Sequence, residues 1–237
     1  MPDTDPARLK AALPRLGVLV GIWAGLVGLL VAAGEIIIHS AAITGFDQHV
    51  TREVVSWRTP ALNSVMHAVT WLGSWVALVF AAVVVILLVV RKRLPVLAAI
   101  VGLFAWAGEA AGVRIAKEVV TRDRPPQAIW VVIAHGWSFP SGHTAAASVA
   151  FTVLALCVAT LTRNRVIRML GWLIAALAIA VTAFSRVELG VHWTTDVTAS
   201  IIFVGCWLTA IWIVLGGRLR PPPPGSSTKT PDHAEVA

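Results

Sequence analysis

Six apolar stretches constrain this 237-residue chain more than any other feature of its sequence. They are residues 16–34, 72–90, 94–113, 144–162, 166–184 and 197–215. Four of them contain no charged side chain, and the other two contain only Glu109 and Arg168. A helix needs about 20 apolar residues to cross a bilayer, so each stretch has the length of one membrane span. Because the apolar residues run continuously rather than alternating, lipid-facing β-strands are disfavoured.

The overall composition supports a lipid environment. Hydrophobic residues make up 57% of the chain and charged residues 13%, whereas soluble domains carry about 25% charged residues. So little charge cannot solvate an ordinary globular surface, and so apolar a chain is not intrinsically disordered. We predict an all-α polytopic membrane protein whose six transmembrane helices form a bundle within residues 16–216. A cytoplasmic N-terminal segment, 1–15, and a disordered, Pro-rich cytoplasmic tail, 217–237, are expected to flank it.

The Lys and Arg residues predict how the spans are oriented. If the N-terminus is inside the cell, twelve of the nineteen Lys and Arg residues fall in cytoplasmic segments and seven fall outside. This bias agrees with the positive-inside rule and makes both termini of a multi-pass protein of the cell membrane cytoplasmic. The net charge of +7 is therefore interpreted as a signal for orientation, and no nucleic-acid partner is expected.

The predicted outer segment 41–70 is long and has a pattern of its own. Phe46, Val50, Val54 and Trp57 recur near helical spacing, and polar residues occupy the other faces. The pattern fits a helix that lies on the outer membrane surface, and it equally fits a packed connector between two spans.

Two further outer segments are rich in polar chemistry. Three cations, Lys117, Arg124 and Arg186, stand at the predicted outer ends of three spans. Charged groups at the membrane are costly and usually functional. Three positive charges in one region would repel each other unless they shared a negative ligand, so they indicate an anion site.

The starts of the fourth and sixth spans indicate phosphate chemistry. Residues 140–143 read Pro-Ser-Gly-His, in which Ser141 can cap the helix and Gly142 allows close approach of a ligand. A helix N-terminus offers N–H donors and a favourable dipole to phosphate. His192 and Asp196 are four residues apart, hence on one helix face. Such an Asp can fix the tautomer of the His and leave its other ring nitrogen free as a nucleophile.

Together these residues resemble the three-part signature of the type 2 phosphatidic acid phosphatase superfamily, the lipid phosphate phosphatases. The signature reads K-x6-R-P, then P-S-G-H, then S-R-x5-H-x3-D, and every position is matched at the family's spacing. The matching residues are Lys117, Arg124, Pro125, Pro140, Ser141, Gly142, His143, Ser185, Arg186, His192 and Asp196. The six predicted spans extend the resemblance over most of the chain.

The resemblance implies a phosphatase with its active site at the extracytoplasmic ends of the helices and with no metal or cofactor. In such an enzyme His192 attacks phosphorus to form a phosphohistidine, and Asp196 orients its ring. His143 donates a proton to the leaving group and then activates water. The residues implied to hold the phosphate oxygens are Lys117, Arg124, Ser141, Gly142 and Arg186.

The substrate implied by the resemblance is a membrane lipid phosphate or diphosphate that enters from the bilayer. Polyprenyl diphosphate, phosphatidic acid and phosphatidylglycerol phosphate are the candidates. The alternative function is a lipid transporter or scramblase that binds phosphate headgroups without hydrolysis. Two His and one Asp beside the cations favour the enzyme, because binding alone needs no nucleophile. The sequence leaves open the physiological substrate, the oligomeric state and the roles of Glu109, Arg114 and Glu188.

Overall fold

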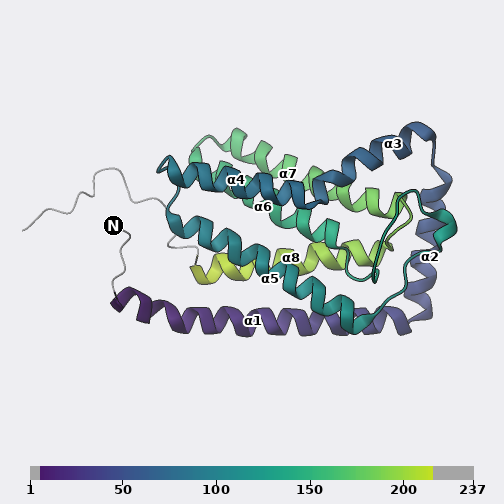
Figure 1. Cartoon of the computed structure of the whole chain (residues 1–237), viewed down its shortest axis with the longest axis horizontal. Coiled ribbons are helices and arrows are strands. Elements are labelled where there is room, and N and C mark those ends of the chain that lie inside the picture. The colour runs from purple at the N-terminus through teal and green to yellow at the C-terminus, as the bar shows by residue number, and fades with distance from the viewer. Residues whose placement is uncertain (1–5, 216–237) are drawn as a thin grey trace, which may run out of the picture.

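The computed structural model describes residues 6–215 as a bundle of helices along one long axis (Figure 1). Its elements are α1 (Pro6–His39), α2 (Ala41–Ser56), α3 (Pro60–Val69), η1 (Thr70–Gly73), α4 (Trp75–Val90), α5 (Val96–Val120), η2 (Gln127–Ile129), α6 (Gly142–Leu161), α7 (Arg165–Glu188) and α8 (Thr194–Leu215), where η marks 3-10 helices. No strand occurs between residues 6 and 215, and the all-α prediction is confirmed. Because α1 begins at Pro6, the expected N-terminal segment is helical from there on. The expected tail, 217–237, lies outside the described residues.

Five of the six predicted spans are single helices long and apolar enough to cross a membrane, namely α1, α5, α6, α7 and α8. The predicted span 72–90 differs, because it belongs to a bent pair. Residues Pro60–Gly73 and Trp75–Val90 meet at an angle of 45°. The break falls at Ser74, whose extended backbone (φ −85°, ψ 172°) ends η1 and whose hydroxyl caps α4 by accepting from the Val76 N–H. The second predicted span is therefore not one straight helix, and the structure has six spans only if this bent pair counts as one.

Two helices run further than their apolar stretches predict. Helix α5 continues past residue 113 to Val120, and α7 continues past residue 184 to Glu188. Lys117 and Arg186 consequently lie in the last turns of these helices instead of in loops. Lys117 donates there to the Trp137 carbonyl, and Arg186 donates to the Thr70 hydroxyl. Because these charged side chains have polar partners, the helices continue past the apolar stretches.

The basic turns of the chain lie at one end of the bundle, and its long polar connections lie at the other (Figure 1). Helix α1 begins and α8 ends at one end, and the short basic turns 91–93 and 163–165 lie at that end too. At the opposite end, α2 lies across the tips of the long helices, and the loops after α5 and α7 are found beside it. The polar signature residues thus share one end of the bundle, and the basic turns share the other.

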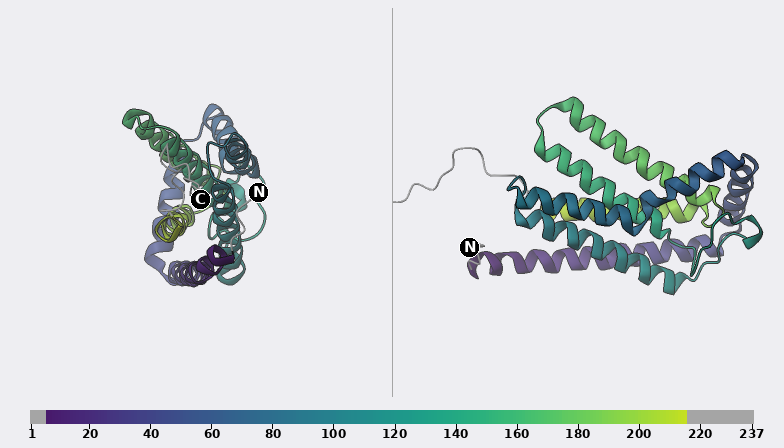
Figure 2. Two further views of the ribbon diagram at one scale, coloured as in Figure 1. Left: turned by 90° about the vertical axis from the view of Figure 1, so that its left-hand side faces the viewer. Right: turned by 45° about the horizontal axis from the view of Figure 1, so that its top comes forward.

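Helix α6 forms the centre of the bundle and is the most buried of the continuous spans. Its first half is a run of small residues, and Ala145, Ala147 and Ala150 are almost completely buried. Small side chains allow membrane helices to approach closely. Helix α7 by contrast leans away from the others (Figure 2), and it exposes large apolar side chains such as Leu173 and Ile174. These faces suit a lipid surrounding and not water.

The structure bears out the packed alternative for helix α2. It packs on α7 and α8 and buries Asp47, Thr51 and Val54 on one face. Phe46 and Trp57 remain about half exposed at the end of the bundle, where a membrane interface would be. A carboxylate on the packed face is unexpected in an interfacial helix, and Asp47 is paired there with Arg122.

Gly73 brings the break between η1 and α4 against the start of α6. A Cβ atom added at Gly73 would collide with the backbone carbonyl of His143 and would lie 2.7 Å from Thr182 Cγ2. Only glycine allows the backbones of η1 and α6 to approach so closely.

Replacing Gly73 with alanine is therefore expected to destabilise the fold. Overpacking a tight contact costs about 1–3 kcal/mol, which thermal unfolding in detergent would detect as a lower Tm for Gly73→Ala. Gly45→Ala is the matched control, since nothing lies within 4 Å of a Cβ at Gly45 in α2, and it should keep or raise the Tm. Equal Tm values for the two variants would contradict the close approach.

Candidate active site

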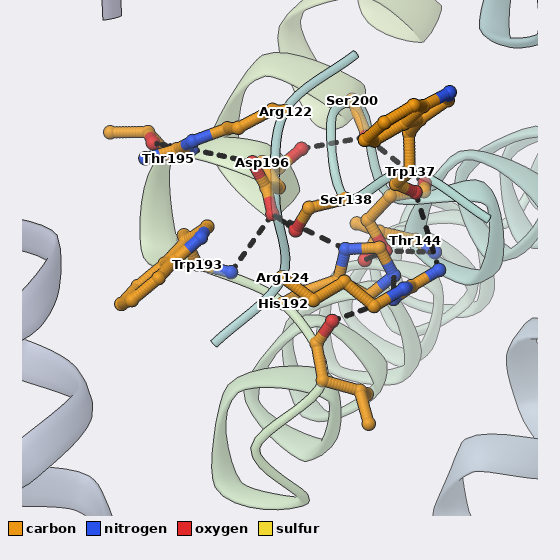
Figure 3. A network of polar contacts seen from close by, with 12 residues as sticks. Arg122, Arg124, Trp137, Ser138, Thr144, His192, Trp193, Thr195, Asp196 and Ser200 are labelled. Atoms are coloured by element: carbon orange, nitrogen blue, oxygen red, sulfur yellow. Dashed lines mark hydrogen bonds and ion pairs between the residues drawn. The ribbon is translucent and has the colours of Figure 1, made fainter. Parts of the chain in front are cut away.

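The eight predicted site residues come from four helices and two loops at one end of the bundle. Lys117 and Arg186 lie in the last turns of α5 and α7, and Asp196 lies in the first turn of α8. Ser141 is the N-cap of α6, and Gly142 and His143 are its first two residues. Arg124 and His192 lie in the loops that follow α5 and α7. Figure 3 shows Arg124, His192 and Asp196 within one network of polar contacts.

The turn that carries His192 depends on Gly190. Helix α7 ends at Glu188, and Gly190 then adopts a left-handed conformation with φ of 75°. The N–H groups of Val191 and His192 both bond back to the Arg186 carbonyl at 3.2 Å. This is the usual way in which a glycine after a helix satisfies its last carbonyl groups. It also fixes the backbone of His192 directly against the last turn of α7.

The two ring nitrogens of His192 have different partners. Nδ1 lies 3.3 Å from Asp196 Oδ2, and Nε2 lies 3.2 Å from Arg124 Nη1. An ionised carboxylate only accepts, and a guanidinium only donates. The contacts therefore assign the proton to Nδ1 and the lone pair to Nε2, which faces the cations.

Burial keeps the His192 ring neutral. The side chain is almost fully buried, and this lowers the pKa of His192 to about 3. Asp196 opposes the shift in pKa, whereas Lys117 and Arg124 add to it. The imidazole is consequently uncharged at neutral pH, with a free lone pair on one ring nitrogen, which is the form that can act as a nucleophile.

The Asp196 carboxylate is fully buried and has donors at both oxygen atoms. Oδ2 accepts from His192 Nδ1, from the Ser138 hydroxyl and, at 2.9 Å, from the Trp193 N–H. Oδ1 accepts from Arg122 Nη1 at 2.6 Å. A buried charge is tolerated only when it is paired and hydrogen-bonded in this way. The carboxylate that orients His192 is therefore held by three residues besides His192.

Three of the residues in this network were not identified as site residues from the sequence. Ser138 and Arg122 bind Asp196 directly, and Asp47 of α2 binds Arg122 Nη2 at 2.7 Å. Arg122 stands between Lys117 and Arg124 within the first part of the signature, and that position was the only available signal. Ser138 and Asp47 are ordinary polar residues of outer segments, and their role appears only when the loops fold together.

Lys117 and Arg124 are held by backbone carbonyl groups of the two loops that follow α5 and α7. Lys117 Nζ donates to the Trp137 carbonyl at 2.5 Å, and Arg124 donates to the carbonyls of residues 135–137 and of Val191. Burial lowers the pKa of Arg124, and Asp196 opposes this shift. These carbonyl groups hold the two cations near His192. Because carbonyl groups carry no net negative charge, they do not neutralise the cations as a carboxylate would.

Arg186 approaches from α7 and is almost completely buried. Its Nη1 donates to Thr70 Oγ1 of η1 at 2.6 Å, but its buried Nε has no partner among the described residues. Arg186, Arg124 and Lys117 all lie within electrostatic range of His143. The three predicted cations and both histidines thus lie near one another at this end of the bundle, and an unpaired buried donor among them suits an anionic ligand.

Ser141 fixes the start of α6. Its hydroxyl accepts from the N–H and the hydroxyl of Thr144, at 3.5 and 3.1 Å. Its own N–H donates to the Asp196 carbonyl at 3.3 Å, which ties α6 to α8. Ser141 therefore serves as a helix cap here, and its predicted contact with phosphate stays a prediction.

Glu188, Arg114 and Glu109, whose roles the sequence left open, do not take part in the contacts around Asp196. Glu188 is fully buried and faces Arg58, with Nε and Oε1 3.8 Å apart. Arg114 is exposed and pairs with Glu118 at 3.4 Å, and Glu109 is buried within α5.

No group of three or more His, Cys, Asp or Glu side chains that could hold a metal ion occurs in the part of the chain that the structure describes.

The chain matches known proteins along most of its length. The model of the PAP2 superfamily matches residues 96–220. Phosphatidylglycerophosphatase B of Bacillus subtilis (strain 168) is 30% identical over 164 residues, which cover 68% of this chain and 78% of that protein.

Two solved structures are similar as well. The crystal structure of the first transmembrane PAP2 type phosphatidylglycerolphosphate phosphatase from Bacillus subtilis has a TM-score of 0.64 at 26% identity, covering 84% of this chain and 94% of that one. The crystal structure of Aquifex aeolicus LpxE has a TM-score of 0.52 at 23% identity, covering 69% and 93%. The second likeness supports the fold alone.

The family model, the similar sequence and the shared fold agree with the signature residues that gather around His192 and Asp196. The chain is a multi-pass membrane protein of the PAP2 superfamily, and its similar proteins indicate a phosphatase.

Proposed function

We propose that the protein hydrolyses lipid phosphates through a phosphohistidine at His192. The observation that carries this proposal is the state of the His192 ring. Its Nδ1 is bound to Asp196, and its Nε2 faces Arg124 within a group of three cations. A neutral imidazole with one nitrogen fixed and the other directed at an anion site has the geometry of an activated nucleophile.

The proposed reaction has two steps. In the first, the lone pair of His192 Nε2 attacks phosphorus and the bond between phosphorus and the lipid oxygen breaks. His143, in its protonated form, gives its proton to the leaving oxygen, while Asp196 stabilises the positive charge of the phosphorylated ring. In the second, His143 takes a proton from water, the resulting hydroxide attacks phosphorus, and the N–P bond breaks to release phosphate and restore His192.

The cations supply the electrostatic part of the mechanism. In phosphoryl transfer the charge lies on the equatorial oxygens, so catalysis is mainly positioning and charge stabilisation. Lys117, Arg124 and Arg186 can provide this without a metal ion. The N-terminus of α6 at Gly142 adds N–H groups and a helix dipole of the favourable sign.

A lipid substrate is supported by an apolar cavity of about 510 Å³ between α4, α5 and α6. Its lining includes Trp75, which is next to the break at Ser74, and apolar side chains such as Leu78, Ala82 and Leu103. Since the break contacts the backbone of His143, a hydrocarbon tail in this cavity would hold its phosphate near the site. Among the candidates, phosphatidylglycerol phosphate comes first, because phosphatidylglycerophosphatase B is a similar protein; phosphatidic acid and polyprenyl diphosphate follow.

The proposed site faces the outside of the cell membrane. The basic turns 91–93 and 163–165 share the end of the bundle opposite the site (Figure 1). The positive-inside rule places that end, with both termini, in the cytoplasm. A transporter or scramblase that only binds headgroups is the alternative, and hydrolysis by the purified protein distinguishes the two.

We expect the purified protein to release phosphate from at least one member of a panel of lipid phosphates. The panel consists of phosphatidylglycerol phosphate, phosphatidic acid and polyprenyl diphosphate, with a soluble sugar phosphate as reference. His192→Ala should lower the rate by more than about 10³-fold, since loss of a single electrostatic donor already costs about 10²–10³. His49→Ala, on the exposed face of α2, is the control and should keep the rate. Full activity of His192→Ala would exclude the mechanism.

Vanadate should inhibit the enzyme, and chelators should not. Vanadate adopts the five-coordinate geometry of the transition state, which the site is expected to bind more tightly than the substrate. Incubation with EDTA followed by the phosphate-release assay should leave the rate within about twofold, the scatter of such an assay, because three cations replace the metal. A strict requirement for Mg²⁺ would contradict the proposal.

Filling the apolar cavity should affect long-chain substrates selectively. Ala82→Trp places an indole where two or three methylenes of a lipid tail would lie, and each buried methylene contributes about 0.8 kcal/mol. We expect kcat/KM to fall roughly ten- to fifty-fold for a long-chain lipid phosphate and to stay unchanged for a short-chain analogue. Leu173→Trp, on the exposed face of α7, should have neither effect. Equal losses on both substrates would show that the cavity does not hold the tail.

A further inference from the structure

Arg122 is a buried cation that faces the carboxylates of Asp47 and Asp196. Figure 3 shows it beside Asp196. Its Nη1 lies 2.6 Å from Asp196 Oδ1, and its Nη2 lies 2.7 Å from Asp47 Oδ2. The side chain is 6% exposed, and both carboxylates are fully buried. The guanidinium therefore joins α2 to the carboxylate that orients His192.

We propose that Asp47 and Arg122 are a positioning pair that fixes the Asp196 carboxylate and thereby the attacking nitrogen of His192. The inference rests on the proposed function, in which Asp196 orients and stabilises the His192 ring. Neither Asp47 nor Arg122 touches the substrate. They act through Asp196.

The contacts of the pair concentrate on the turn that carries the nucleophile. The Arg122 guanidinium lies 5.6 Å from the centre of the Trp193 ring and donates to Thr195 Oγ1 at 2.7 Å. Asp47 accepts from the Thr195 N–H at 3.0 Å and from its hydroxyl. Arg122 and Asp47 thus contact residues 193, 195 and 196, which all lie within four positions of His192. A bridge that served only to attach α2 to the bundle would not need contacts with this whole turn.

The charge of the group also favours a catalytic purpose. Two carboxylates and one guanidinium leave a net charge of −1 next to a ring that becomes positive when Nε2 is phosphorylated. With Asp196 and Arg122 alone the charges would cancel, and the guanidinium would weaken the stabilisation of the positive ring. Charges interact strongly at low dielectric, so Asp47 restores the negative charge that Arg122 would otherwise remove.

The position of Asp47 gives α2 a role in the site. The family model begins at residue 96, and Asp47 lies well before it, in the helix that crosses the end of the bundle (Figure 1). A helix whose packed face carries a fully buried aspartate needs a partner for it, because an unpaired buried charge is strongly destabilising. Arg122 and Thr195 are the partners of Asp47, and through Arg122 helix α2 is connected to the Asp196 carboxylate.

The test compares Asp47→Asn, Arg122→Lys and the double variant with the wild-type protein. Asparagine keeps the size of Asp47 but removes its charge, and lysine keeps the charge of Arg122 but cannot bridge two carboxylates with a rigid fork. We expect each single variant to lower kcat about 10- to 100-fold, the scale of a small misplacement of a catalytic group. KM should stay within about twofold, because no substrate contact is lost.

The double variant separates positioning from general damage. If both residues act through Asp196, the double variant should be no worse than the poorer single variant by more than about threefold. Independent structural lesions would instead multiply. Glu53→Gln, an exposed carboxylate on the same helix, is the control and should match the wild type in kcat, KM and Tm.

Thr195→Val keeps the proposal testable if Asp47→Asn does not fold. It removes only the hydroxyl between Asp47 and Arg122 and leaves every charge paired, so a fall in kcat of roughly three- to tenfold is expected, a fraction of the loss from a misplaced group. An unchanged kcat in a folded Asp47→Asn or Thr195→Val variant, or multiplicative losses in the double variant, would overturn the positioning role. A wild-type protein that releases no phosphate from any substrate of the panel would instead overturn the proposed function.

Discussion

The buried carboxylate of Asp196 is the constraint on which the rest of the site depends. An ionised group without solvent is very unfavourable unless donors surround it, and here the donors come from widely separated parts of the chain. The loop after α5 provides Arg122, the segment before α6 provides Ser138, and the turn before α8 provides His192 and the Trp193 N–H. Satisfying this one carboxylate therefore brings both ends of the α5–α6 connection and the α7–α8 turn to the same point.

The membrane explains why these loops must be so well ordered. Backbone groups near the apolar region need partners within the protein. The carbonyl groups of residues 135–137 find theirs in Lys117 and Arg124, and the N–H of Ser141 finds its partner in the Asp196 carbonyl. The interactions that satisfy the loop backbone are thus the same ones that hold the cations near His192. Structural and functional requirements are met by one set of contacts.

Much of this arrangement could be predicted from the sequence, because it depends on local patterns. The apolar stretches predict the spans. The spacing of four residues predicts that His192 and Asp196 meet, which they do, but not on one helix face as expected, because α8 begins only at Thr194 and His192 lies in the turn before it. The broken span was not predictable, since Ser74 and Gly73 are unremarkable residues in an apolar stretch and their effect comes from contact with α6. Asp47 was also missed, for a similar reason. Its polar side chain fits a water-facing surface equally well, and only the folded position of Arg122 reveals its partner.

The distribution of acidic residues at this end of the bundle completes the electrostatic design. Arg58 faces Glu188, Arg114 pairs with Glu118, and Arg122 is shared by Asp47 and Asp196. Lys117, Arg124 and Arg186 instead donate to neutral groups, namely backbone carbonyls and the Thr70 hydroxyl. Arg58, Arg114 and Arg122 thus have carboxylate partners, whereas the three cations around His192 form no ion pair among the described residues, and their positive charge is concentrated there. An anion is then attracted towards His192 and not to the surrounding surface, which suits the phosphoryl transfer proposed for this site.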